Sequence, residues 1–310
     1  MLTASVGVMA YNEEQNIGKL LAALTGQSVQ NVEIRQIIVV SSGSTDRTDD
    51  IVREWVAKDE RISLIRQESR EGKASAINLF LDAAEADIFV LESGDTIPAP
   101  DCVELMLAPF QDPGVGMTGG RPVPVDDPNT FMGFVVHMLW RLHHMLALKS
   151  PKLGEMVAFR SFVRSIPPET AVDEASIEAL VIEHGSSLAY APEAIIYNKG
   201  ASTVGDFLKQ RRRIYAGHIW LSKVQSYEVS TKKVGGILSV LLEDLTPAPR
   251  TLCWTLGGVF LEFVGRLLGA IDYYVLKRNP YTWEVSQSTK SLDAPATRDA
   301  GGREAGAVDG

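Results

Sequence analysis

Hydrophobic and polar positions along the first hundred residues switch repeatedly between a strand pattern and a helix pattern. Short apolar runs at 6–9, 37–40, 62–65 and 88–91 are typical of strands that are buried on both faces. Between these runs, apolar residues recur three and four positions apart, which is the period of one helix face. Strands that alternate with helices in this way predict an α/β fold with a doubly wound, mainly parallel sheet flanked by helices.

The middle of the chain continues with helix and strand patterns. Residues 131–149 have the period of an amphipathic helix, and runs at 188–190 and 194–197 predict late strands. The histidines of the 131–149 segment do not have the spacing of a zinc site, so we expect them to serve the structure or to contact an acceptor.

A long apolar segment, 251–276, ends the ordered pattern. As one helix it would extend roughly 39 Å at about 1.5 Å per residue, which exceeds the ~30 Å hydrocarbon core of a bilayer. It carries Glu262, Arg266 and Asp272, and each central charge costs about 2.5–3.5 kcal/mol on insertion. Glu262 and Arg266 lie four residues apart and can pair, which reduces that cost. A spanning helix and an interfacial helix both remain open.

These patterns divide the chain into three parts. Residues 1–225 form the α/β domain, and 226–280 form a membrane-associated or transmembrane helical segment. Residues 281–310 are rich in Gly, Ala, Asp, Arg and Ser without periodicity, which predicts a disordered tail.

Composition narrows the functional classes. The 310 residues carry a net charge of −9, which argues against a protein that binds nucleic acid through a basic face. Cys102 and Cys253 lie far apart in the sequence, so neither a disulfide framework nor a cysteine zinc site is expected. The first residues lack the basic region of a signal peptide, and we therefore expect the body of the protein in the cytosol.

Polar and acidic residues follow three predicted strands, at 10–14, 41–46 and 92–95. Ligands of doubly wound sheets bind at the carboxyl ends of the strands. The Ser-rich turn at 41–46 precedes a helix and suits a nucleotide or phosphate, although such turns also serve simply as helix caps. Asp95 is a candidate ligand for Mg²⁺ or Mn²⁺ beside a pyrophosphate, with a helix-capping role as the alternative.

Two charged clusters occur later in the chain. Asp173 and Glu174 precede an apolar helix, where an acidic pair can supply a general base or simply complement the helix dipole. Residues 210–213 form a dense basic cluster, and arginine side chains match phosphate oxygens with two hydrogen bonds. A solvated helix face or contact with anionic lipid is the alternative for that cluster.

Six short motifs stand in an order that is specific, although each alone is weak. They are Ala10-Tyr11-Asn12-Glu13-Glu14, Ser41-Ser42-Gly43-Ser44-Thr45-Asp46, Gly72-Lys73 with Asn78, Ser93-Gly94-Asp95, Asp173-Glu174 with the stretch 185–194, and Gln210-Arg211-Arg212-Arg213. With these motifs the chain resembles the family 2 glycosyltransferases, which are inverting nucleotide-sugar enzymes of GT-A fold. The resemblance covers about residues 4–220.

The resemblance implies roles for particular residues. Glu174 occupies the position of the family's catalytic aspartate, so it is the implied base, with Asp173 as the less favoured choice. Asp95 would bind a divalent cation, Mg²⁺ or Mn²⁺, on the donor diphosphate. The implied nucleotide-sugar-binding residues are Ala10, Asn12, Glu13, Ser41, Ser42, Lys73, Gln210, Arg211 and Arg213.

The chain departs from the family pattern at several positions. Ser41 and Ser42 replace an acidic pair that contacts the nucleoside, which leaves the base preference open. Asp95 is the surviving acid of the D-x-D motif, and Glu92 has a different offset. Ile214 replaces the Trp that packs against the acceptor chain in processive synthases, which favours a non-processive enzyme.

The resemblance implies an inverting glycosyltransferase that moves a sugar from a nucleotide-diphosphate sugar to an acceptor hydroxyl or lipid phosphate. The apolar C-terminal segment favours a lipid-linked or glycan acceptor at the cytoplasmic face of a membrane, reached by a peripheral helix or a single-span anchor. Two alternatives remain. One is a transferase with a soluble acceptor, whose C-terminal helices form a core or dimer contact. The other is a non-catalytic member that binds nucleotide sugars or acts as a scaffold.

Overall fold

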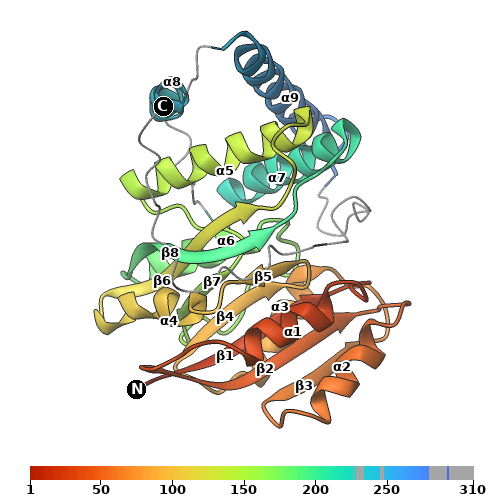
Figure 1. Ribbon diagram of the computed structural model, residues 1–310, viewed down its shortest axis with the longest axis vertical. Coiled ribbons are helices and arrows are strands. Elements are labelled where there is room, and N and C mark those ends of the chain that lie inside the picture. The colour runs from red at the N-terminus through yellow and green to blue at the C-terminus, as the bar shows by residue number, and fades with distance from the viewer. Residues whose placement is uncertain (226, 228–233, 245–247, 279–291, 293–310) are drawn as a thin grey trace, which may run out of the picture.

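The computed structural model describes residues 1–225, 227, 234–244, 248–278 and 292 (Figure 1). These residues form one eight-stranded sheet in the order β3-β2-β1-β4-β7-β6-β8-β5. The strands are β1 (Leu2–Ala10), β2 (Val32–Ser42), β3 (Ile62–Gln67), β4 (Ile88–Ser93), β5 (Thr96–Pro98), β6 (Val115–Pro124), β7 (Val157–Arg160) and β8 (Ser187–Asn198).

The helices follow the strands along the chain. They are α1 (Ile17–Thr25), α2 (Thr48–Val56), α3 (Lys73–Ala83), α4 (Cys102–Leu107), the 3₁₀ turn η1 (Ala108–Gln111), α5 (Phe131–Lys149), α6 (Asp173–Glu183), α7 (Val204–Val224), α8 (Val234–Asp244) and α9 (Pro249–Tyr274). The predicted α/β fold is confirmed, and the 131–149 helix has the predicted bounds.

The N-terminal half is parallel, as predicted. β1 pairs in parallel with β2 and β4, and β2 pairs in parallel with β3. Two hydrophobic clusters cover opposite faces of this part of the sheet. Val6 and Val8 of β1 join the cluster that contains α1, whereas Met9 joins the cluster that contains α3. Gly7 allows α3 to approach closely, because a Cβ there would lie 2.5 Å from the ring of Phe80.

The C-terminal half of the sheet is mixed. β7 runs antiparallel to β4 and to β6, whereas β6 and β8 are parallel. The two late strands predicted at 188–190 and 194–197 are parts of one strand, β8. The interruption between them is a register shift against β6, where Tyr190 pairs with Gly119 and Ile195 with Arg121. Pro192 lies in this shift, where its missing N–H does not break the ladder.

Helices α5, α7 and α9 form a further layer beyond the carboxyl ends of β1, β2 and β4 (Figure 1). α9 packs along α7 through glycines. A Cβ on Gly265 would lie 2.5 Å from the Cβ of Arg211, and one on Gly269 would lie 2.6 Å from the carbonyl oxygen of Arg212. α9 is long and apolar enough to cross a membrane. The predicted tail, 281–310, lies outside the described residues except for Leu292.

Candidate active site

A cavity of about 1290 Å³ lies between the carboxyl ends of the parallel strands and the helices α5, α6, α7 and α9. Most of the predicted site residues line it, although they come from segments far apart in the sequence. These lining residues are Ala10, Glu13, Ser42, Lys73, Asp95, Asp173, Glu174, Gln210, Arg211 and Arg213. The geometry therefore brings the strand-end motifs and the two later charged clusters to one place.

Asn12 and Ser41 shape the cavity wall without lining it. The Asn12 side-chain oxygen accepts a hydrogen bond from the Thr45 amide at 2.8 Å, and the Asn12 amide donates to the Ser44 hydroxyl at 3.1 Å. The Ser41 hydroxyl lies 2.9 Å from the same Ser44 hydroxyl. These bonds join the turns that follow β1 and β2, so both residues position the turns.

The turn after β2 presents a polar atom to the cavity. Gly43 has φ +70°, and a Cβ there would lie 2.9 Å from the Arg70 amide nitrogen, so only glycine fits this turn without strain. The preceding residue, Ser42, is buried, and its hydroxyl has no hydrogen-bond partner among the described residues. Because a buried hydroxyl usually has a partner, Ser42 is a candidate contact for the donor.

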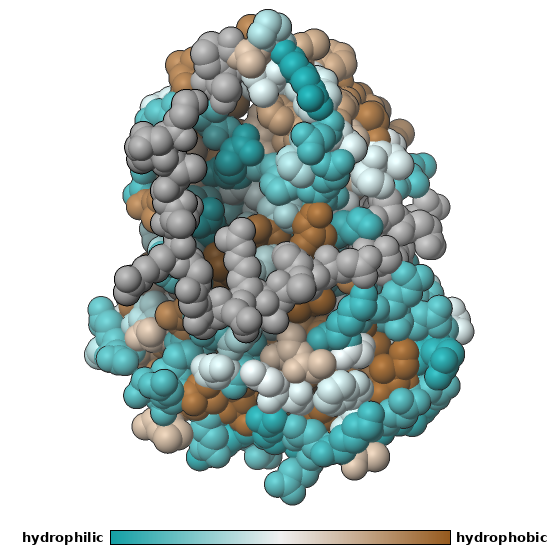
Figure 2. Space-filling model, viewed as in Figure 1, coloured by the Kyte–Doolittle hydropathy of each residue, from teal (hydrophilic) through white to brown (hydrophobic). Residues whose placement is uncertain are grey.

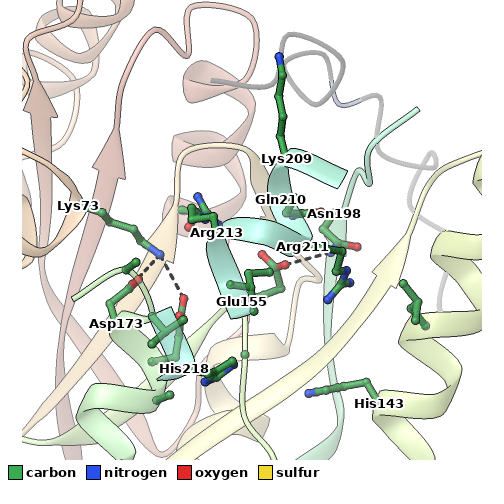
Figure 3. A pocket seen from close by; sticks show the side chains of 18 of the residues that line it. Lys73, His143, Glu155, Asp173, Asn198, Lys209, Gln210, Arg211, Arg213 and His218 are labelled. Carbon is green, nitrogen blue, oxygen red and sulfur yellow. Dashed lines mark hydrogen bonds and ion pairs between the residues drawn. The ribbon is translucent and has the colours of Figure 1, made fainter. Parts of the chain in front are cut away.

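Lys73 holds the two acidic side chains at the start of α6 (Figure 3). Its ammonium nitrogen lies 2.6 Å from Asp173 Oδ2 and 3.1 Å from Glu174 Oε1. Burial alone would lower the pKa of Lys73, but Asp173 and then Glu174 outweigh it and raise that pKa. Burial, and next the charge of Asp173, raise the pKa of Glu174. The three groups form one partly buried, charge-paired unit.

The two carboxylates of this unit differ in access to the cavity. The side chain of Asp173 is 6% exposed and that of Glu174 is 23% exposed. A general base must reach the proton that it removes, and a raised pKa increases its proton affinity. Glu174 meets both requirements, and its side chain is more exposed than that of Asp173.

Two of the cavity arginines of α7, Arg211 and Arg213, point in different directions. In Figure 3, Arg213 points toward Lys73 and Asp173, whereas Arg211 points away from them, toward the side where His143 lies. Burial lowers the pKa of Arg213, and Asp173 and other nearby carboxylates oppose that effect. Arg211 lies 3.2 Å from Glu262 of α9. Of the two, Arg213 therefore faces the acidic side of the cavity.

Asp95 fits a minimal site for a divalent cation. It lines the cavity just after β4. Glu92 does not assist it, because Glu92 is buried, accepts a hydrogen bond from Thr96 and is not a lining residue. Burial raises the pKa of Glu92 to about 8, so this carboxyl is mostly protonated at neutral pH. Among the described residues, no group of three acidic, His or Cys side chains could hold a metal. A cation would therefore need diphosphate oxygens and water beside Asp95.

Sequence reasoning missed the segment just before β7. It contributes Glu155, whose φ is +61° and whose pKa is raised to about 7 by burial and then by Asp95. It also contributes Lys152, another lining residue. The antiparallel pairing of Val157 with Leu91 places this segment at the carboxyl end of β4. A sequence analysis that predicted this strand pairing would have placed Lys152 and Glu155 at the site.

Models of two glycosyltransferase groups match the chain. The glycosyl transferase family 2 model covers residues 5–166, and the glycosyl transferase family group 2 model covers residues 88–277.

Curated relatives match over shorter regions. Glycosyltransferase AglE of Haloferax volcanii is 28% identical over 117 residues, which are 38% of this chain and 38% of that protein. Poly-beta-1,6-N-acetyl-D-glucosamine synthase of Staphylococcus aureus is 24% identical over 216 residues, 66% of this chain and 51% of the synthase. The matches thus span about half or less of the length of these relatives.

Solved structures share the fold. Mannosyltransferase PcManGT from Pyrobaculum calidifontis, in complex with GDP-Man and Mn²⁺, superimposes with a TM-score of 0.57 at 20% identity, covering 90% of this chain and 81% of that one. Glucosyl-3-phosphoglycerate synthase from Mycobacterium tuberculosis gives a TM-score of 0.51 at 20% identity, covering 72% and 80%. The fold is GT-A-like, and the chain belongs to glycosyltransferase family 2.

Proposed function

We propose that the chain is an inverting glycosyltransferase that transfers a sugar from a nucleotide-diphosphate sugar to an acceptor brought to the membrane surface. The observation that carries this proposal is the Lys73–Asp173–Glu174 unit, which faces a cavity that Asp95 and Arg213 also line. A base, a cation ligand and a guanidinium for the diphosphate are the groups that a single displacement at the anomeric carbon requires.

In this mechanism Glu174 takes the proton of the acceptor hydroxyl as the acceptor oxygen bonds to the anomeric carbon. The bond from that carbon to the diphosphate oxygen breaks on the opposite face, and its electron pair leaves with the nucleoside diphosphate. Arg213 stabilises the negative charge that develops on the leaving diphosphate. A divalent cation on Asp95 would add Lewis-acid stabilisation of the same oxygens.

The donor nucleoside would contact the turns after β1 and β2. Ala10, Glu13 and Ser42 line that side of the cavity. Asn12 and Ser41 would act indirectly, because their hydrogen bonds hold the turns in place. Lys73 would position the two carboxylates rather than bind the nucleotide, since both of its close contacts are to Asp173 and Glu174.

Asp95→Asn tests the donor site. We expect it to remove metal-dependent binding of the nucleotide sugar, because an amide is a much weaker ligand for Mg²⁺ or Mn²⁺ than a carboxylate. Calorimetry with a panel of UDP-, GDP- and dTDP-sugars, with and without Mn²⁺, measures this. Asp82→Asn, on the exposed side of α3, is the matched control. Unchanged metal dependence in Asp95→Asn would place the metal elsewhere, and a folded wild type that binds no donor would favour a non-catalytic member.

The contacts of α9 support an interfacial position for this helix. Its two acidic residues face α7: Arg212 donates two hydrogen bonds to Asp272, at 2.5 and 2.7 Å, and Arg211 pairs with Glu262. A spanning α9 in this arrangement would carry the arginines of α7 into the hydrocarbon core, at a high energetic cost.

The opposite face of α9 is apolar and exposed. Leu256, Phe260, Phe263 and Leu267 are 50–64% exposed and recur three and four residues apart. Figure 2 shows hydrophobic residues at the surface of the upper end of the molecule, the end where Figure 1 places α9. One charged face against the protein and one exposed apolar face favour a helix that lies in the plane of the membrane surface.

The double variant Leu256→Ser, Phe260→Ser tests this interfacial position. Neither residue lines the cavity, and both side chains are 63% exposed. We expect the vesicle partition coefficient to fall tenfold or more, because each side chain loses about 1–2 kcal/mol of apolar burial in lipid. Flotation with phosphatidylcholine–phosphatidylglycerol vesicles measures it, and Val56→Ser, Ile182→Ser is the matched control. Wild-type protein that does not bind vesicles would contradict membrane association, and a variant that still requires detergent for extraction would indicate a spanning helix.

A further inference from the structure

The cavity continues beyond the Lys73 unit into a part where positive side chains converge. Lys152 precedes β7, Arg211 lies on α7 and Arg266 lies on α9, and all three line the cavity. His143 of α5 lines the same cavity. We call Lys152, Arg211 and Arg266 the cationic cluster, and the neutral ring of His143 adjoins it. The transfer mechanism above uses none of these groups.

Lys152 has no hydrogen-bond or ion-pair partner within the part of the chain that the structure describes. The two nearby acids bind other groups. Glu178 accepts from the Leu153 amide at 3.2 Å and from the Tyr227 hydroxyl at 3.1 Å. Glu262 lies 3.2 Å from Arg211 and 2.9 Å from Arg266. The ammonium group of Lys152 is thus left with a positive charge that protein carboxylates only partly balance.

The electrostatic surroundings of Lys152 agree with a charge that protein carboxylates only partly balance. Burial, and next the charge of Arg211, lower the pKa of Lys152 to about 8, against the weaker opposing effect of Glu178. Burial lowers the pKa of His143 to about 3, so its ring is neutral and presents one N–H donor. His143 is 7% exposed, and its Nδ1 has no partner among the described residues. Buried polar groups that have no protein partner indicate a ligand that forms hydrogen bonds with them.

The cationic cluster adjoins the transfer site. Glu178 lies one helical turn after Glu174 on α6, a rise of about 6 Å. Lys152 lies three residues before Glu155, on the same segment. A molecule whose hydroxyl or oxyanion reaches Glu174 would therefore extend along the cavity toward Lys152.

We propose that Lys152, with Arg211 and His143, binds a phosphate group of the acceptor in a subsite separate from the donor diphosphate. Phosphate oxygens accept hydrogen bonds from these donors, and their negative charge balances the positive charge of Lys152 and Arg211. The assignment of this ligand to the acceptor rests on the proposed function, because it places the nucleophile beside Glu174. Val259 and Phe263 of α9 also line the cavity and are 43% and 64% exposed. They give an apolar chain attached to the phosphate a path toward the exposed face of α9.

Calorimetry on the full chain in detergent tests the subsite with three probes: geranyl phosphate, glycerol 1-phosphate and geraniol. We expect Lys152→Met to weaken binding of geranyl phosphate tenfold or more, and binding of geraniol to be weak and independent of Lys152. Lys149→Met is the matched control, because Lys149 is an exposed lysine that pairs with Glu243 and does not line the cavity. Thermal unfolding verifies that Lys152→Met is folded.

The two phosphate probes distinguish the source of the group. Lys152-dependent binding of geranyl phosphate alone supports a lipid phosphate, and equal Lys152-dependent binding of glycerol 1-phosphate supports a soluble phosphate acceptor. Equal affinity of Lys152→Met and wild type for both phosphates would overturn the subsite. Binding of nucleotide sugars with Mn²⁺, measured on the same samples, should not change in Lys152→Met. Failure of the wild-type protein to bind any nucleotide sugar would refute the proposed function without affecting the phosphate result.

Discussion

Glu174→Gln is expected to abolish sugar transfer while donor binding persists. The substitution keeps the size of the side chain but removes its ability to accept the acceptor proton, and loss of a general base typically lowers the rate by a factor of about 10²–10⁴. Donor affinity should remain, because the Glu174 side chain contacts Lys73 and does not belong to the turns after β1 and β2 that the donor would contact. Release of nucleoside diphosphate measures the rate, and calorimetry measures donor binding.

The pH profile gives an independent test of the same assignment. Because the pKa of Glu174 is raised by burial and by Asp173, activity should fall with acidification at a higher pH than for an ordinary glutamate. Glu183→Gln, at the exposed end of α6, is the matched control and should behave as wild type. Loss of donor binding together with transfer would show that Glu174 binds the donor, and full activity of Glu174→Gln would place the base elsewhere.

Lys73→Met is expected to destabilise the fold and also to abolish transferase activity. Removing the lysine leaves Asp173 and Glu174 buried without their shared partner, and breaking a buried ion pair in this way costs about 3–5 kcal/mol. Urea unfolding at pH 7 measures the loss of free energy of unfolding. Lys58→Met, at an exposed position after α2, is the matched control.

The pH dependence of this effect has a definite sign. In wild type the pKa of Lys73 is raised above its unfolded value, so its contribution is complete at neutral pH and is lost only in strong alkali. In Lys73→Met, Glu174 loses the positive charge that lowers its pKa, so it binds its proton more tightly in the folded state. The variant should therefore become more stable relative to wild type as the pH falls from about 8 to about 5. A deficit that is equal at both pH values would contradict a charge-paired unit.

The parallel half of the fold follows from the sequence because burial on both faces leaves a continuous apolar run. Residues 37–40 are such a run, and their burial in β2 agrees with it. β6 is different: its sequence, VGMTGGRPVP, has no period of two and contains glycines and prolines. Its partners β7 and β8 lie far along the chain, so tertiary pairing rather than local pattern creates this strand.

The candidate site was predictable as a set of residues but not as a geometry. The motifs identified Lys73 and Glu174, yet their contact joins positions 101 residues apart, which no local pattern reveals. For Arg211 and Arg213, helix geometry alone would have predicted that the two side chains point in different directions. Residues two apart on a helix point about 200° apart, so the two arginines cannot bind the same phosphate equally.

The C-terminal helix shows what a hydropathy pattern leaves open. The pattern could not decide between spanning and interfacial positions, because both need the same apolar residues. The facts that favour an interfacial position are the pairings of Glu262 and Asp272 with arginines of α7, which depend on tertiary packing. These pairings support an interfacial helix as a proposal that the vesicle experiment tests.

The most direct test of the central proposal is the anomeric configuration of the product. Wild-type protein is incubated with Mn²⁺ and the α-linked nucleotide sugar that it binds, with geranyl phosphate as acceptor, and proton NMR follows the first product formed. Transfer by a single displacement predicts a β-linked sugar, with a phosphate oxygen of geranyl phosphate as the nucleophile. An α-linked first product would contradict the proposed mechanism.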